Sequence, residues 1–169
     1  MIALLSSLLT ACLADDGPVG MSLLFQSAGR EVLVQKFDFD GQRGPVPGAV
    51  GGVFPKGGAQ MSFMPGDSKR PIPRFVDIEW TVESNELRLE MDRVLYSRSD
   101  KFSDAWIKDF NAFMKTRVPR YTRRIDLTPI ITPELLAKVR ADRRGSLLKL
   151  IITFNNDQVD IKAEVEKWR

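Results

Sequence analysis

The chain of 169 residues contains no histidine and a single cysteine, Cys12. Without histidine, a Ser-His-Asp triad, a Cys-His pair and a histidine metal ligand are all impossible. One thiol cannot close a disulfide within the chain, so the apolar core must hold the fold together. These absences exclude the commonest catalytic groups. We therefore expect a protein that is not an enzyme, with no cofactor and no metal.

Two kinds of catalytic chemistry survive these exclusions. Asp77, Glu79 and Glu83 alternate along one predicted strand, and paired carboxylates serve in glycoside hydrolysis. Alternating acids on an outward face are also what solubility alone produces, and we favour that interpretation. Ser146 and Lys149 have the spacing of a Ser-x-x-Lys motif, but residues three apart on a strand point to opposite faces.

The sequence also has no apolar run long enough to cross a membrane. A spanning helix needs about 20 mostly apolar residues, whereas the run that begins at Met1 is cut off by Asp15 and Asp16. A short apolar core followed by small residues is typical of an export signal. We expect a lipoprotein signal peptide at 1–11, with a cleaved signal without lipid or a buried terminal helix as the alternatives.

The residues Leu9-Thr10-Ala11-Cys12 resemble the lipobox of bacterial lipoproteins. The resemblance implies that Cys12 carries diacylglycerol, that the chain is cut before it, and that the new amino terminus is acylated, with palmitate as a typical chain. Several acyl chains hold a protein firmly on a bilayer, whereas one does not. Leu13 follows the cysteine where an Asp commonly retains such proteins in the inner membrane. The expected location is the inner leaflet of the outer membrane, facing the periplasm.

After a tether at 12–20, we expect one domain at 21–169. Apolar and polar residues alternate along several of its segments, as in half-buried strands. In 32–39 the alternation places Leu33, Phe37 and Phe39 on one apolar face. Further strands are predicted near 60–64, at 75–83, at 85–97, and as a terminal hairpin at 146–154 and 159–168.

Two segments have helical spacing instead. The first is 104–117, behind Ser103 and ended by Pro119; the second begins with Thr132 as N-cap and Pro133 at the first helical position, and Gly145 stops it. Together the elements predict an α+β fold, with an antiparallel β-sheet, two α-helices packed on one face and a C-terminal β-hairpin.

The segment 41–58 holds seven glycines and three prolines. Loops longer than about 12–15 residues are uncommon unless they bind something or move. This loop is therefore the first candidate for function, with a passive connection as the alternative.

The net charge of +3 is unevenly distributed. Residues 1–95 hold 9 basic and 12 acidic side chains, whereas 96–169 hold 16 and 10. The basic excess gathers at 115–124 and again at 138–145. Such clusters fit phosphate, lipid headgroups or an acidic protein patch, or are simply a solvated face.

A strand ending in Phe39-Asp40-Gly41, a loop closing in Gly57-Gly58 and the run Val76-Asp77-Ile78-Glu79-Trp80 follow the lipobox in that order. This order resembles small bacterial lipoproteins of uncharacterised function associated with type VI secretion, several of which are immunity proteins to phospholipase effectors. Many relatives carry a cysteine pair after the glycines, where this chain has Ala59, Gln60 and Met61.

The resemblance implies a periplasm-facing inhibitor whose partner is a toxic effector encoded nearby, with the lipid anchor on the membrane and no nucleic acid. In this interpretation the 41–58 loop covers the effector's active site, and the basic segment steers the effector. The alternative is a structural lipoprotein of envelope or secretion-machine assembly. The residues predicted to contact the partner are Arg43, Val50, Val53, Phe54 and Lys56 in the loop, and Arg117, Arg120, Arg123 and Arg124 in the basic segment.

Overall fold

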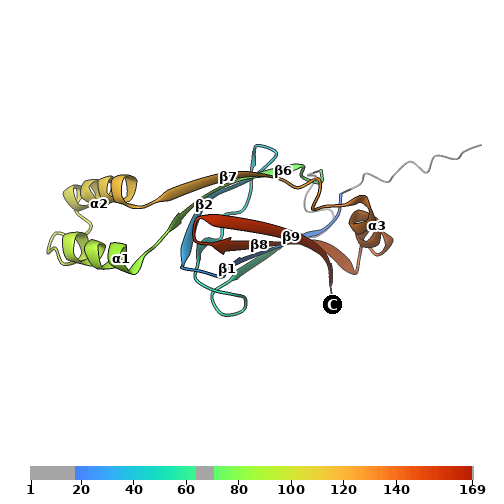
Figure 1. The fold of residues 1–169 in the computed structure, drawn as a ribbon, viewed down its shortest axis with the longest axis horizontal. Helices are drawn as coiled ribbons and strands as arrows, with labels where there is room; N and C mark the ends of the chain where they lie inside the picture. Colours follow the sequence, from blue (N-terminus) through green and yellow to red (C-terminus); the bar gives the residue numbers. More distant parts are fainter. Residues whose placement is uncertain (1–17, 64–70, 169) are drawn as a thin grey trace, which may run out of the picture.

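A computed structural model of the chain describes residues 18–63 and 71–168. The described part is elongated (Figure 1), with a body of two β-sheets in the middle, a pair of helices projecting from one end and a single helix at the other. The predicted α+β class is confirmed. The expected signal peptide at 1–11 and Cys12 lie outside the described residues. Val19 and Gly20, which we assigned to the tether, are buried.

Sheet A has the strand order β5-β1-β8-β9. β1 pairs antiparallel with β5 and parallel with β8, and β8 and β9 form the predicted terminal hairpin. The prediction of a purely antiparallel sheet is therefore wrong, because β1 and β8, the first and the penultimate strands of the body, are parallel neighbours. The bounds are β1 Met21–Ser27, β5 Ala59–Phe63, β8 Ser146–Asn155 and β9 Gln158–Lys167.

Sheet B has the order β3-β2-β6-β7, with β4 also paired to β2. Its bounds are β2 Val32–Phe39, β3 Gln42–Arg43, β4 Gly48–Val50, β6 Phe75–Val82 and β7 Arg120–Asp126. The single predicted sheet is thus replaced by two, and the predicted 41–58 loop contains two short strands.

The prediction of which side chains of β2 face the core is wrong for the first half of the strand and right for the second. The register against β6 shifts between Val34 and Lys36, which marks a β-bulge and exchanges the two faces of the strand. Val32 and Val34 are buried before the bulge and Phe37 and Phe39 after it, while Leu33 is exposed. The bulge lets both halves of β2 contribute apolar side chains to one core.

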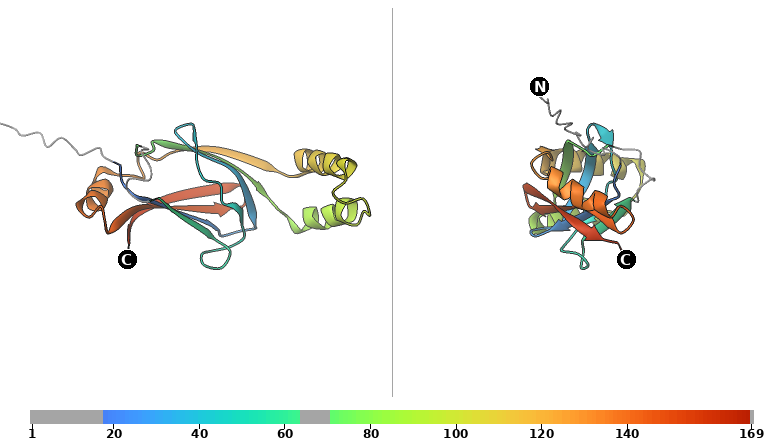
Figure 2. Two further views of the ribbon diagram at one scale, coloured as in Figure 1. Left: turned by 180° about the vertical axis from the view of Figure 1, so that it is seen from behind. Right: turned by 90° about the vertical axis from the view of Figure 1, so that its right-hand side faces the viewer.

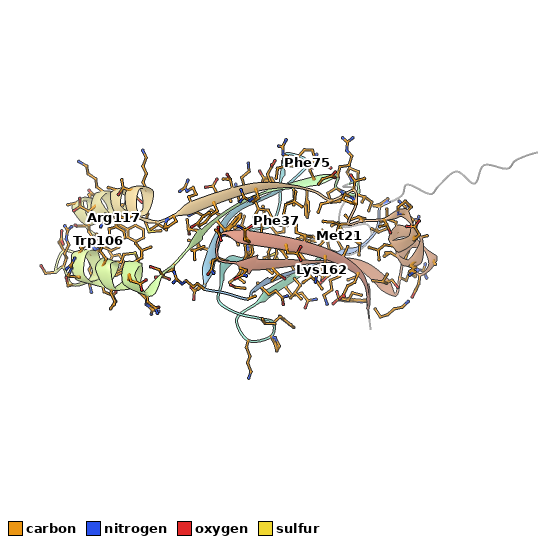
Figure 3. All side chains as sticks on the ribbon, viewed as in Figure 1. Met21, Phe37, Phe75, Trp106, Arg117 and Lys162 are labelled. Atoms are coloured by element: carbon orange, nitrogen blue, oxygen red, sulfur yellow. The ribbon has the colours of Figure 1, made fainter. Side chains whose placement is uncertain are left out.

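The two sheets pack face to face around that core. Phe25 of sheet A meets Phe37 of sheet B edge-on, with ring centroids 4.9 Å apart, and Trp80 lies 5.6 Å from Phe154 by the same measure. Trp80 is fully buried, and its indole N–H donates to the Asn156 carbonyl over 2.8 Å. Figure 3 shows Phe37 between the sheets and Trp106 in a separate group of side chains.

That separate group belongs to the helical arm, which consists of α1 (Asn85–Met91), the π-helical turn η1 (Asp92–Tyr96) and α2 (Asp104–Arg117). The strand predicted at 85–97 is wrong. Ser84 caps α1 by accepting the Leu87 N–H, and Leu87 and Leu95 pack with Trp106 and Phe113 in a small core of the arm's own. α2 has the predicted bounds, with Ser103 as its N-cap.

The arm is inserted between neighbouring strands, because β6 leads into it and β7 leads out (Figures 1 and 2). The predicted packing of two helices on one sheet face is therefore wrong for α2. The other predicted helix, α3 (Pro133–Ala141), begins at the Thr132 cap as expected but ends four residues before Gly145. Val139 of α3 joins the core of the body from the end opposite the arm.

Candidate functional site

The glycine-rich segment between β4 and β5 folds into a closed loop over 51–58. The Gly51 N–H donates to the Gly57 carbonyl over 2.9 Å, and the Lys56 N–H donates to the Val53 carbonyl over 2.8 Å. The Ser27 N–H at the end of β1 donates to the Gly52 carbonyl over 3.0 Å. The loop is therefore closed at its base and tied to sheet A.

Glycine is required where the two sides of this loop meet. Gly57 has a φ of +94°, a backbone conformation that other residues rarely adopt, and a Cβ there would lie 2.9 Å from the Gly52 nitrogen. A Cβ on Gly52 would overlap the Lys56 carbonyl. The Phe54-Pro55 peptide at the tip is cis. The glycine pattern thus serves close approach of two backbone segments.

The five predicted contact residues of the loop separate into three groups. Val53 and Phe54 are 54% and 45% exposed at the tip, beside the exposed Lys56. Val50, in contrast, is fully buried in β4 opposite Val32, so its predicted role as a surface contact needs correction. Arg43 of β3 lies opposite Asp38 of β2 in the sheet. Asp38 is six residues, or about 20 Å, along β2 from Val32, which lies at the base of the loop. Only Val53, Phe54 and Lys56 share one surface.

The basic segment 115–124 runs from the end of α2 into strand β7, and most of its charges are paired. Arg124 lies opposite Asp77 on β6 and donates two hydrogen bonds to its carboxylate, of 2.7 and 2.8 Å. These bonds lower the pKa of Asp77 and raise that of Arg124. The Arg124 guanidinium also lies 4.4 Å from the centre of the Phe75 ring.

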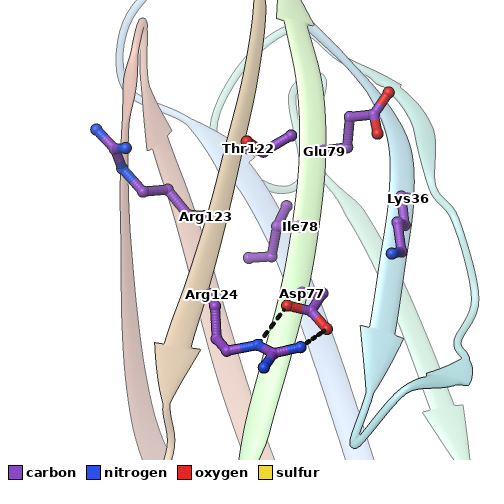
Figure 4. A pocket seen from close by; sticks show the side chains of 7 residues that line it. All are labelled: Lys36, Asp77, Ile78, Glu79, Thr122, Arg123 and Arg124. Carbon is purple, nitrogen blue, oxygen red and sulfur yellow. Dashed lines mark hydrogen bonds and ion pairs between the residues drawn. The ribbon is translucent and has the colours of Figure 1, made fainter.

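The other arginines of the segment do not form a common patch. Arg120 pairs with Glu79 over 3.0 Å, and Arg117 pairs with Glu90 of the arm. Arg123 points away from Arg124, on the other side of β7 (Figure 4), and no carboxylate of the described residues pairs with it. The four predicted residues therefore lie on three different surfaces, and three of them are neutralised by acids.

A shallow hollow of about 260 Å³ lies on this outer part of sheet B. Most of its charged side chains already bond to one another or to flanking residues, as Asp77 does with Arg124 and Glu79 with Arg120, and Arg123 is the exception among them. The hollow therefore has little unpaired charge to offer a ligand. It is lined by Lys36, Asp77, Ile78, Glu79, Thr122, Arg123 and Arg124 (Figure 4).

Sequence reasoning missed the helical arm as a possible contact surface. Four large apolar side chains on it are exposed to solvent, with Phe102 the most open at 75%. Phe102 has a φ of +67° and lies next to the Trp106 ring, with centroids 5.3 Å apart. The spacing Leu87, Met91, Leu95 was the available signal for a helix here. The exposed set is Leu89, Val94, Phe102 and Ile107.

Within the described ranges 18–63 and 71–168, no cluster of three or more acidic, cysteine or histidine side chains could hold a metal ion. The helices in the same ranges are too short or too polar to span a bilayer. The chain matches no known protein-family model, and neither a curated protein nor a solved structure matches it.

Proposed function

We propose that this protein is a lipid-anchored component of the bacterial envelope that binds a toxic effector and blocks its active site. The observation that carries the proposal is the closed 51–58 loop, which projects from the body with Val53 and Phe54 exposed at its tip (Figure 1). The lipobox-like Leu9-Thr10-Ala11-Cys12 and the resemblance to type VI immunity lipoproteins support the cellular setting.

The form of the loop suits an inhibitor. Its hydrogen bonds hold the tip in one conformation before binding, so less conformational entropy is lost when a partner is met. An aromatic side chain entering a pocket is a common anchor of tight interfaces, and Phe54 is the aromatic residue at this tip. Lys56 would lie at the polar rim. The paired arginines of β7 would contribute less to steering than their number suggests.

The direct test uses the full-length protein, purified from membranes in detergent, against the purified product of the neighbouring gene. The double variant Val53→Asp, Phe54→Asp places charges at the loop tip. We expect its affinity to fall by about tenfold or more, with inhibition of the effector lost in parallel. The measurements are the dissociation constant and the residual activity of the effector.

The arm supplies a matched control. Val94→Asp, Phe102→Asp changes the same two residue types at exposed positions of the arm, and we expect wild-type affinity from it. If the loop variant bound and inhibited as the wild type does, the loop would have no part in inhibition. Failure of the wild type to bind or inhibit the neighbouring product would refute the proposed function.

The second candidate is a structural lipoprotein of envelope or secretion-machine assembly. The exposed apolar side chains of the arm favour it, because they lie at the end of the molecule far from α3 and from the start of the described chain (Figure 1). In this case the purified protein would retain a resident envelope complex. That interaction would be lost with the arm variant and kept with the loop variant.

A further inference from the structure

Three segments distant in the sequence meet at the α3 end of the body. The Leu148 N–H at the start of β8 donates to the Gly20 carbonyl over 2.9 Å, close to where the described chain begins. The Trp168 N–H, after β9, donates to the Gly145 carbonyl over 2.8 Å. The turn after α3 therefore lies beside the end of the described chain, and the beginning of that chain is bonded three residues further on, near the start of β8 (Figure 2).

This end has an excess of positive charge. Of its two carboxylates, Asp142 accepts hydrogen bonds from Lys167 over 3.1 Å and from the Gly145 N–H over 3.0 Å. Lys138 and Arg144 are exposed. Lys138 lies one helical turn after Glu134 and contributes to the lowered pKa of that carboxyl, whereas Arg144 forms no ion pair with a carboxylate of the described residues. The charged side chains here are Glu134, Lys138, Arg140, Asp142, Arg143, Arg144 and Lys167.

The same end has an exposed tryptophan. Trp168 is 48% exposed, whereas Trp80 is fully buried in the body and Trp106 is 6% exposed in the arm. The hydrogen bond to Gly145 holds the Trp168 backbone against the basic turn. Tryptophan with neighbouring lysine and arginine is the combination found at membrane–water interfaces, where the ring lies at headgroup level and the cations meet phosphate.

We propose that the α3 end rests on an anionic lipid surface, with Trp168 in the interface and Lys138 and Arg144 over the headgroups. The inference rests on the lipid anchor of the proposed function. Cys12 is six residues before Pro18, and six extended residues span about 20 Å at most. A bilayer holding that cysteine is therefore within reach of the basic turn. The helical arm, at the other end, points away from the bilayer.

The position of the charges favours lipid over an acidic protein as the occupant. Basic residues near a lipid anchor add an electrostatic term to membrane binding, and this cluster lies where the anchored segment joins the body.

The test uses the protein as the cell produces it, after an intact-mass measurement of the acyl chains on Cys12. The protein is reconstituted into vesicles with brominated acyl chains, made either of phosphatidylglycerol and phosphatidylethanolamine or of phosphatidylcholine alone. The signal is the Trp168 emission, obtained as the difference between the wild type and Trp168→Phe. We expect a shift to shorter wavelength and loss of most of this emission in the anionic vesicles. The effect should disappear in phosphatidylcholine or at about 0.5 M salt.

Two matched pairs of variants locate the contact. Lys138→Glu, Arg144→Glu should abolish the quenching, whereas Lys101→Glu, Lys108→Glu, which reverses two exposed charges of the arm, should preserve it. A tryptophan moved to the arm by Phe102→Trp in the Trp168→Phe protein should not be quenched.

Each contrary result has a distinct meaning. Unquenched Trp168 on a lipidated protein would refute this orientation and leave the inhibitor proposal standing. An unmodified Cys12 would remove the anchor on which both proposals rest. If Lys138→Glu, Arg144→Glu abolished binding of the effector and left the quenching intact, the basic turn would be a protein site and the lipid inference would be wrong.

Discussion

The two regions joined by β6 and β7 have cores of very different size. Among the described residues, twenty buried apolar side chains form the cluster between the sheets, whereas five form that of the arm. The body also ties distant segments together, since β1 pairs with β8 more than a hundred residues later. The arm joins only segments close in sequence, and it connects to the body through two strands.

This difference indicates that the regions have separate stabilities. A small cluster with few ties to the rest of the fold opens at a lower free energy than a shared core. The arm also exposes four large apolar side chains, whose exposed surface adds nothing to the stability of its core. We therefore expect the body to hold its fold when the arm is disrupted, but not the reverse.

The largest effect is expected from Trp80→Ala in the body. Trp80 is fully buried, packs on Phe154 and Tyr121, and donates its indole N–H to a backbone carbonyl. Its removal should lower the free energy of unfolding by about 3–5 kcal/mol, and sheets and arm should be lost together. Denaturant unfolding followed by circular dichroism measures this loss. Trp168→Ala, at an exposed tryptophan, should shift the midpoint little.

Trp106→Ala should have a smaller and local effect. Trp106 is central to the arm core, and its indole N–H donates to the Leu95 carbonyl over 2.9 Å. We expect a loss of about 3 kcal/mol in the stability of the arm, seen as faster hydrogen exchange at 85–117 with unchanged protection in β1 and β8. Ile107→Ala, next to it but 44% exposed, is the control that should leave exchange unaltered. Loss of protection across the sheets would show that arm and body unfold as one unit.

The same contrast explains which elements the sequence predicts. The strands expected at 75–83 and 146–154 and the helix expected at 104–117 were predicted to within a residue at each end, because one periodicity runs through each of them. Leu87, Leu89 and Met91 fit an alternating pattern, but Leu87, Met91 and Leu95 fit a helix as well. Packing against Trp106 decides between the two, and the sequence does not show that contact. The bulge in β2 is equally hidden, because it moves the following side chains to the other face of the strand, and no residue type in the sequence indicates where that happens.

The candidate site was predictable only in part. The glycines and the tip residues Val53 and Phe54 marked the loop, whereas the burial of Val50 depends on its pairing with Val32. The basic run 115–124 predicted a charged surface. Pairing of β7 with β6 brings Asp77 and Glu79 against that run, and a linear sequence does not show which strands become neighbours.

The smallest expected effect concerns one ion pair in each region. Arg124 lowers the pKa of Asp77 in the body, and Arg98 lowers that of Asp100 in the arm, in both cases chiefly by hydrogen bonding to the carboxylate. A lowered folded-state pKa stabilises the fold fully above the unfolded-state value of about 3.9, and the stabilisation is lost as the pH falls through the folded-state pKa.

Asp77→Asn should lower the free energy of unfolding by no more than about 1 kcal/mol at neutral pH, a difference that vanishes on acidification. Asp100→Asn should leave the unfolding midpoint of the body unchanged at every pH, because its pair stabilises only the arm. Denaturant titrations of both variants at neutral and acidic pH measure this, and an equal shift of the body midpoint by the two would mean that arm and body share one stability.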